Sequence, residues 1–183
     1  RRLPVASSRR CVRVRSMILN EPGPAVGSGP LELEERLAPV PGPGEVVIEV
    51  SVCAVCRTDL QLATGDLPAR RRPIVPGHQI VGRVVDRNED VDPARHPIGA
   101  RVGVAWIAST CGACRHCTTG RENLCPDARF TGWDCDGGFA ELVSVRADFT
   151  YALPESMSDL HVAPLLCGGT IGYRSLKVAG VDL

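Results

Sequence analysis

The sequence of 183 residues lacks a long apolar run, an internal repeat and a low-complexity segment. No stretch approaches the ~18 apolar residues needed to cross a bilayer, so we expect no membrane partner. Net charge is also absent, because 21 basic residues balance 21 acidic ones. Residues 1–16 hold six arginines and no acid, so the remaining residues carry a net charge of −6. Such a charge disfavours nucleic-acid binding.

The basic start of the chain is rich in Arg and Ser and free of acids, which is typical of a targeting peptide. We favour another interpretation, in which residues 1–16 are a disordered basic leader ahead of a start at Met17. The sequence has nine cysteines and no secretory signal. This combination predicts a reducing, cytoplasmic compartment in which thiols bind metal.

Strand signals dominate the first 150 residues. Apolar and polar residues alternate over 45–52, which predicts a half-buried strand. Further short runs lie at 80–85, 101–107, 139–145 and 149–153, separated by Gly and Pro. Such strands favour a small barrel or sandwich over a parallel sheet. We expect a helix from about residue 56 to 63 that ends at Gly65, and a second after Ser158 that is interrupted at Pro164 and continues to Gly180.

Four cysteines are spaced as a metal site. They are Cys111, Cys114, Cys117 and Cys125, and their spacing is Cys-x2-Cys-x2-Cys-x7-Cys. Thiolates are soft ligands, and Zn²⁺ requires only a tetrahedron of donors. Gly112 and Gly120 supply the permissive backbone that the turns need. Two disulfides or four unrelated thiols are alternatives, but Cys-x2-Cys spacing suits chelation better than bridging. The pattern therefore predicts a closed, structural zinc lobe.

A second set of candidate ligands is spread along the chain. Cys56, His78 and Cys167 offer two thiolates and one imidazole, with no fourth protein ligand evident. Taken singly, His78 is typical of a turn and Cys167 of a core thiol. Taken together they predict a catalytic zinc site, which needs three protein ligands and an open position. Asp59 is placed to accept the second N–H of His78 and fix its tautomer.

The sequence resembles the zinc-dependent medium-chain alcohol dehydrogenases in five stretches between about Met17 and Lys177. They are CAVCRTDLQLATGDLP, PGHQIVGRV, CGACRHCTTGRENLCP, DGGFAELV and APLLCGGTIGYRSLK. The resemblance implies a mainly β fold with a few helices, the GroES-like domain, a partly open β-barrel that carries a structural-zinc lobe and both zinc ions. We expect this catalytic domain over residues 17–157, and a helical segment over 158–183 that leads to a Rossmann domain absent from this chain.

The resemblance also implies roles for individual residues. Thr58 corresponds to the hydroxyl that carries the substrate proton away, and Arg57 to the residue that meets the cofactor pyrophosphate. Leu67 and Trp106 correspond to substrate-pocket positions, although ordinary core packing explains them equally well. The implied activity is reversible, NAD(P)-linked oxidation of an alcohol to an aldehyde or ketone, in which zinc acidifies the alcohol and a hydride passes to the nicotinamide.

The sequence departs from the family pattern at three places. Gln79 replaces a frequent Glu beside the histidine ligand, and Gln61 replaces a histidine that ends the proton relay in many members. No Gly-x-Gly-x-x-Gly turn follows a strand, so we expect this chain alone to be inactive. A non-enzymatic zinc-binding module is the alternative function, and a zinc-free quinone reductase is disfavoured by the two ligand sets. Oligomeric state is open, because the Rossmann half commonly forms the family's dimer interface.

Overall fold

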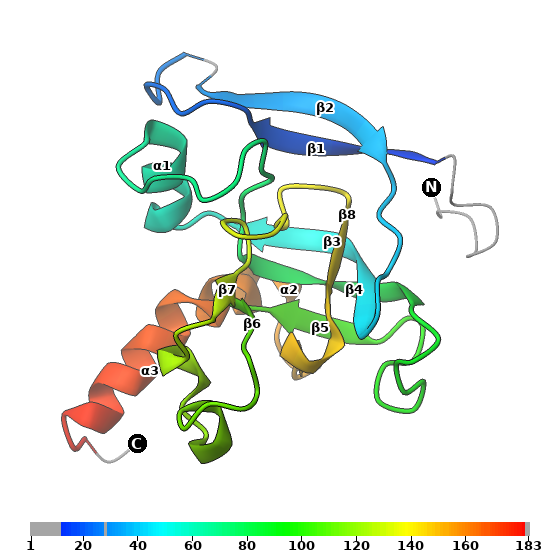
Figure 1. Ribbon diagram of the computed structural model, residues 1–183, viewed down its shortest axis with the longest axis vertical. Helices are drawn as coiled ribbons and strands as arrows, with labels where there is room; N and C mark the ends of the chain where they lie inside the picture. The colour runs from blue at the N-terminus through cyan, green and yellow to red at the C-terminus, as the bar shows by residue number, and fades with distance from the viewer. Residues whose placement is uncertain (1–11, 28, 182–183) are drawn as a thin grey trace.

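A five-stranded antiparallel sheet forms the centre of the computed structural model, which describes residues 12–27 and 29–181 (Figure 1). In spatial order its strands are β8 (Leu142–Arg146), β3 (Glu45–Ala54), β4 (Gln79–Arg87), β5 (Arg101–Val104) and β9 (Thr150–Ala152). Two further antiparallel pairs are β1 (Arg13–Leu19) with β2 (Leu31–Leu37), and β6 (Ile107–Ser109) with β7 (Arg129–Phe130). The sheets stay open, which agrees with the predicted mainly β, partly open architecture.

The central sheet is covered on both faces. Val46 and Ile48 belong to the main core cluster, whereas Val47, which points the other way, packs with Val14 of β1 and Leu142. Three consecutive residues of β3 are therefore buried, and the predicted alternation of buried and exposed residues is wrong there. The alternation fails because β1 covers the face that the sequence pattern assigns to solvent.

The predicted leader over residues 1–16 is too long. Residues 1–11 lie outside the described residues, but β1 begins at Arg13 and pairs with β2 along its whole length. The Arg15 side chain donates two hydrogen bonds to Glu141, at 2.8 and 2.6 Å, and its backbone N–H donates a third at 2.8 Å. Residues 13–16 are thus part of the folded domain.

Two predicted strands are shorter than expected. The run 101–107 divides into β5 and β6 on either side of Ala105 and Trp106. The run 139–145 contributes only β8, because the backbone of Phe139 pairs with Pro76 and Met17 instead of with β3. In both places the local sequence pattern correctly predicts extended backbone. The bounds of each strand depend on hydrogen bonding to strands that are distant in the sequence, which the local pattern does not contain.

The helices follow the prediction more closely. Helix α1 (Arg57–Thr64) ends before Gly65, and α2 (Asp159–Val162) gives way at Pro164 to the 3-10 turn η5 (Ala163–Leu166). Helix α3 (Gly168–Val178) projects away from the sheets (Figure 1). Shorter 3-10 turns are η2 (Cys117–Thr119), η3 (Glu122–Leu124) and η4 (Ala147–Phe149). None of the helices in the described chain has the length and apolar character required to span a membrane.

Ser158 occupies the N-cap position of α2, but its side chain does not cap the helix. Its backbone is extended directly before α2, as expected of a cap position, but its hydroxyl contacts the Nδ1 atom of His161 at 3.0 Å. The first turn of α2 therefore begins without a side-chain hydrogen bond from Ser158 to a backbone N–H.

Candidate metal centres

Four thiols converge in the lobe between β6 and β7. The sulfur atoms of Cys111, Cys114, Cys117 and Cys125 all lie within 4.8 Å of one another. The distance is 3.6 Å from Cys114 to Cys117 and from Cys125 to Cys111, and 3.9 Å from Cys111 to Cys117. A tetrahedron with Zn–S bonds of about 2.3 Å places its sulfurs about 3.8 Å apart. These three sulfur–sulfur distances are close to those of a tetrahedral zinc site, so the four thiols could hold such an ion.

The local backbone explains why these thiols meet. Gly112 and Gly120 adopt φ values of +70° and +68°, in the left-handed region that glycine tolerates, as the sequence predicted. The first turn aims the N–H of Cys114 at the sulfur of Cys111, at 3.3 Å. Backbone hydrogen bonds from Ala113 and Cys114 lower the pKa of Cys111 to about 7, which favours the thiolate that a metal requires.

Three more ligand atoms converge from distant parts of the chain. Cys56 lies directly before α1, His78 directly before β4, and Cys167 between η5 and α3. Their ligand atoms lie within 4.8 Å of one another, and the two sulfurs are 3.9 Å apart. That sulfur–sulfur distance is again close to the one in a tetrahedral zinc site, so these three residues could hold a metal ion.

Asp59 ties two of these segments together. One carboxylate oxygen accepts the N–H of Cys56 at 2.8 Å, and the other accepts the N–H of Gly77 at 3.2 Å and contacts His78 Nδ1 at 3.1 Å. His78 is 1% exposed and Asp59 is 6% exposed. Because a carboxylate accepts, Nδ1 carries the proton and Nε2 keeps its lone pair. Burial alone would lower the pKa of His78, but Asp59 outweighs it and raises that pKa.

The two cysteines of this site have different proton affinities. Burial tends to raise the pKa of Cys56, but hydrogen bonds from the Thr58 N–H and hydroxyl and the nearby His78 lower it overall. The Thr58 hydroxyl oxygen lies 3.9 Å from the Cys56 sulfur. Burial and the neighbouring Cys56 raise the pKa of Cys167 to about 11. Thr58 and His78 therefore favour the thiolate form of Cys56, which is the form that binds a metal.

Aromatic side chains stand beside His78. Trp106 meets the imidazole edge-on, with ring centroids 4.8 Å apart. Phe130 and Trp133 stack on Trp106 at 5.0 and 5.8 Å, and the Arg70 guanidinium lies 3.8 Å from the centroid of the Trp133 ring. Trp106 was predicted from the sequence as a pocket residue, whereas Phe130, Trp133 and Arg70 were not. Phe130 and Trp133 lie shortly before residues 136–139, which is the only signal that the sequence offers for them, and no pattern marks Arg70.

The two glutamines that depart from the family pattern lie on α1 and β4, and the predicted pocket residue Leu67 lies in the loop after α1. Gln79 is buried, and its amide donates to the carbonyl of Ala54 at 3.2 Å. This bond satisfies the side chain that replaces the family's frequent glutamate. Gln61 is half-buried on α1, and Leu67 is half-buried in the following loop. The pocket role of Leu67 stays a prediction.

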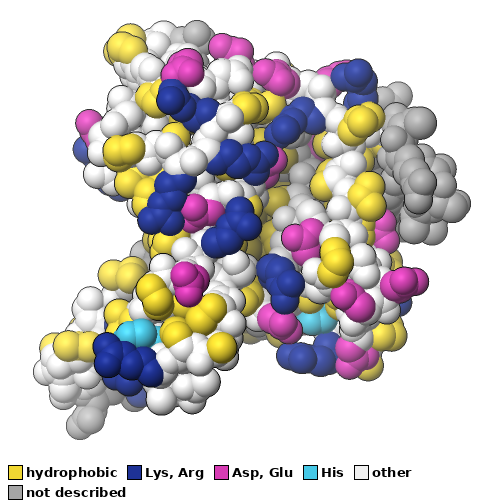
Figure 2. Space-filling view, viewed as in Figure 1, with side chains coloured by type: hydrophobic (Ala, Val, Ile, Leu, Met, Phe, Trp, Pro, Cys, Tyr) yellow, Lys and Arg dark blue, Asp and Glu magenta, His cyan; other side chains and the backbone are white. Residues whose placement is uncertain are grey.

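Arginine side chains gather near the middle of the face in Figure 2, with acidic side chains beside several of them. The ion pairs of the described residues include Arg70 with Asp134 at 3.2 Å and Arg71 with Asp136 at 3.5 Å. Arg57 is exposed at the first residue of α1, next to Cys56. Its role at a cofactor pyrophosphate stays a prediction.

Comparison with known proteins places this geometry in a family. The alcohol dehydrogenase GroES-like domain matches residues 42–155. The chain belongs to this family, the N-terminal domain of zinc-type medium-chain alcohol dehydrogenases. It is 48% identical over 161 residues to the probable alcohol dehydrogenase AdhA of Mycobacterium tuberculosis, covering 86% of this chain and 46% of that protein. An alcohol dehydrogenase of Geobacillus stearothermophilus is 41% identical over 151 residues, covering 82% and 44%.

Solved alcohol dehydrogenases share the fold of this GroES-like domain. A cinnamyl alcohol dehydrogenase of Sorghum bicolor superposes with a TM-score of 0.79 at 31% identity, over 92% of this chain and 48% of that one. A cobalt- and zinc-bound thermostable alcohol dehydrogenase of Pyrobaculum aerophilum gives a TM-score of 0.78 at 29% identity, over 89% and 49%. The chain spans about half the length of the relatives it matches.

Proposed function

We propose that this chain is the zinc-binding catalytic domain of an NAD(P)-linked, zinc-dependent alcohol dehydrogenase. The reaction is the reversible oxidation of an alcohol to an aldehyde or ketone. The observation that carries the proposal is the convergence of Cys56, His78 and Cys167, with Asp59 orienting the imidazole. Three protein ligands leave a position for substrate, which a purely structural site does not need.

The residues around the site have distinct tasks. Asp59 holds the proton on His78 Nδ1, so that Nε2 is available to the metal. A zinc ion bound here would supply a Lewis acid that makes an alcohol hydroxyl more acidic. The Thr58 hydroxyl, next to Cys56, would accept the hydrogen bond of that alcohol and pass its proton on. Trp106 would offer its apolar surface to the carbon chain of the substrate.

The four-thiol lobe serves stability in this proposal. Four sulfur ligands close the coordination sphere, so no position remains for substrate. Cys111, Cys114, Cys117 and Cys125 would hold the second zinc ion of the chain. The lobe contains only short 3-10 turns between β6 and β7, and a structural metal replaces the apolar core that so small a unit lacks.

Cofactor binding is expected to need further protein. The sequence contains no Gly-x-Gly-x-x-Gly turn, although Arg57 would be available to a pyrophosphate. We therefore expect the 183-residue chain alone to bind two zinc ions but no nicotinamide cofactor. Small alcohols and aldehydes are the expected partners, and the cytoplasm is the expected compartment. The non-enzymatic zinc module is disfavoured, because assembly or storage does not require the Thr58 hydroxyl beside a three-ligand site.

Elemental analysis and cofactor titration test this proposal together. The purified chain should contain about two zinc ions. The fluorescence of NADH should not change when the chain is added to it. One zinc ion per chain would leave only the structural lobe and contradict the catalytic site. NADH binding by the 183-residue chain would contradict the assignment of cofactor recognition to other protein.

A further inference from the structure

Residues 136–139, the DGGF stretch, cross the segment that leads to His78. None of these four residues has a role in the function proposed above. Segments 136–139 and 75–78 run against each other through backbone hydrogen bonds. The N–H groups donate from Gly137 to Val75 (2.7 Å), from Gly138 to Gly77 (2.9 Å) and from Phe139 to Pro76 (3.0 Å). Every carbonyl of the three residues before His78 therefore has a partner in the DGGF stretch.

The two backbones approach as closely as glycine permits. A Cβ atom at Gly137 would overlap the carbonyl oxygens of Gly77 and Pro76. A Cβ atom at Gly77 would overlap the ring of Phe139. Glycines at 77 and 137 thus make the crossing possible, because a side chain at either place would push the segments apart.

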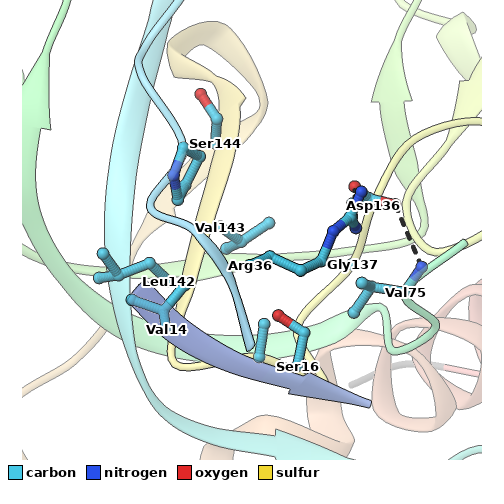
Figure 3. Close-up of a pocket in the computed structure, with 11 residues that line it drawn as sticks. Val14, Ser16, Arg36, Val75, Asp136, Gly137, Leu142, Val143 and Ser144 are labelled. Carbon is cyan, nitrogen blue, oxygen red and sulfur yellow. Dashed lines mark hydrogen bonds and ion pairs between the residues drawn. The ribbon is translucent and has the colours of Figure 1, made fainter. Parts of the chain in front are cut away.

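The carboxylate of Asp136 secures the beginning of this crossing (Figure 3). One oxygen accepts the N–H of Val75 at 3.1 Å, as the dashed line in Figure 3 marks. The other lies 3.2 Å from a guanidinium nitrogen of Arg36 and 3.5 Å from one of Arg71. Asp136 therefore joins β2, the loop before β4 and the DGGF stretch in one place.

The same short segment is held at its other end by Asp59. That carboxylate accepts the N–H of Gly77 and contacts the ring of His78. The chain from Val75 to His78 is thus fixed at its start by Asp136 and at its end by Asp59. Groups held in this way lose less freedom when they bind a metal, because their geometry already exists before binding.

We propose that Asp136 is a positioning residue for His78. By fixing the backbone at Val75, it sets where the imidazole stands relative to the sulfurs of Cys56 and Cys167. This inference rests on the function proposed above, in which His78 binds the metal. The four-thiol lobe takes all its ligands from residues 111–125, so removal of Asp136 should weaken the mixed sulfur and imidazole site selectively.

Cadmium binding followed by ¹¹³Cd NMR tests the proposal in one molecule. The cadmium shift rises with the number of sulfur ligands, so a four-thiolate site and a site with two thiolates and one imidazole give separate signals. Asp136→Ala should weaken cadmium binding at the mixed site, but by less than the roughly 10- to 100-fold that follows loss of a direct partner of a ligand, such as Asp59. The four-thiolate signal should keep its affinity. Asp136→Asn should lose less, because its amide oxygen still accepts the N–H of Val75.

Asp134→Asn is the matched control. Asp134 also accepts a backbone N–H, that of Phe130 at 2.9 Å, and also pairs with an arginine, but it does not hold segment 75–78. This variant should leave both signals unchanged. Asp59→Asn is the positive control, because it removes the carboxylate that touches His78.

The outcomes separate the two proposals. Equal weakening of both sites by Asp136→Ala would show a general role in folding and overturn the positioning role. Unchanged affinity at the mixed site would overturn it as well. A wild-type chain that lacks the mixed signal would instead overturn the catalytic zinc site, and the role of Asp136 with it.

Discussion

The sulfur of Cys56 lies 3.9 Å from the sulfur of Cys167, although 111 residues separate them in the chain. Cys56 is fixed at the start of α1, where Asp59 accepts its N–H. Cys167 is delivered by η5, which packs on the central sheet through Ala163. A pair of thiols at tetrahedral spacing is therefore a product of the whole fold and not of a local turn.

Replacing Cys167 by alanine should remove one zinc ion and leave the other. The remaining Cys56 and His78 offer two ligands, and loss of one of three should weaken binding by several orders of magnitude. The fold should persist, because Cys167 is half-buried and precedes an exposed helix. Elemental analysis should fall from about two zinc ions to about one, with an unchanged far-ultraviolet circular dichroism spectrum.

Cys135→Ala is the matched control for this measurement. Cys135 is also half-buried, but it belongs to neither cluster of ligand atoms. Burial raises the pKa of its thiol to about 11, so it is a poor thiolate. The control should retain both zinc ions. A folded Cys167→Ala protein with two zinc ions would refute the assignment of Cys167.

Replacing Cys114 by alanine should remove the zinc ion of the four-thiol lobe instead, and it should unfold the lobe. Structural zinc sites contribute on the order of 10 kcal/mol in apparent binding free energy, comparable to the stability of a small domain. The variant should lose the zinc of the lobe and expose residues 111–125 to protease. Limited trypsin digestion should then cut after Arg115 and Arg121; both side chains are exposed, but the ordered backbone of the zinc-loaded wild type should resist cleavage there.

His116→Ala is the control for the lobe. His116 lies between Cys114 and Cys117 in the sequence, but four sulfurs already complete the site. Its side chain is half-buried. The variant should retain the lobe zinc and its resistance to trypsin. A Cys114→Ala protein as resistant as wild type would show that the lobe does not depend on metal.

The sequence predicts the four-thiol cluster well because the cluster is local. All four cysteines lie within residues 111–125, and Gly112 and Gly120 mark the turns that bring them together. The meeting of Cys56 with Cys167 was predicted from the set of ligand types and supported by the family resemblance, but no spacing rule marks it, since it depends on how η5 packs on the sheet. Spacing in the sequence carries information about turns, but not about a contact across 111 residues.

Strands β1 and β2 were not predicted, and the reason is physical. On β2, Leu33 and Leu37 are 65% and 64% exposed. The apolar residues of this strand are therefore not on a buried face, and their spacing does not mark a strand. The role of Asp136 at segment 75–78 could not be predicted from the sequence for another reason. The hydrogen bond that fixes segment 75–78 to Asp136 comes from the backbone N–H of Val75, a group that every residue except proline possesses, so no side-chain pattern marks it.

The pairing of Arg15 with Glu141 should make the anchoring of β1 depend on pH. The backbone N–H and the guanidinium of Arg15 hold the pKa of Glu141 below its ordinary value of 4.5. A carboxyl group whose pKa is lower in the folded state stabilises the fold above about pH 4.5, and this contribution disappears as the pH falls through the folded-state pKa. Glu141→Gln should therefore destabilise the chain at pH 7 and have a diminishing effect in acid.

Urea unfolding of the wild type and of Glu141→Gln, at pH 7 and at several values below 4.5, measures this dependence. Acid also releases zinc from thiolates, but this loss affects both proteins and cancels in their difference. Glu155→Gln removes the same charge from an exposed turn residue and is the matched control. Its difference from wild type should stay small at every pH. A Glu141→Gln difference that is constant from pH 7 into the acid range would show that the carboxylate charge does not anchor β1.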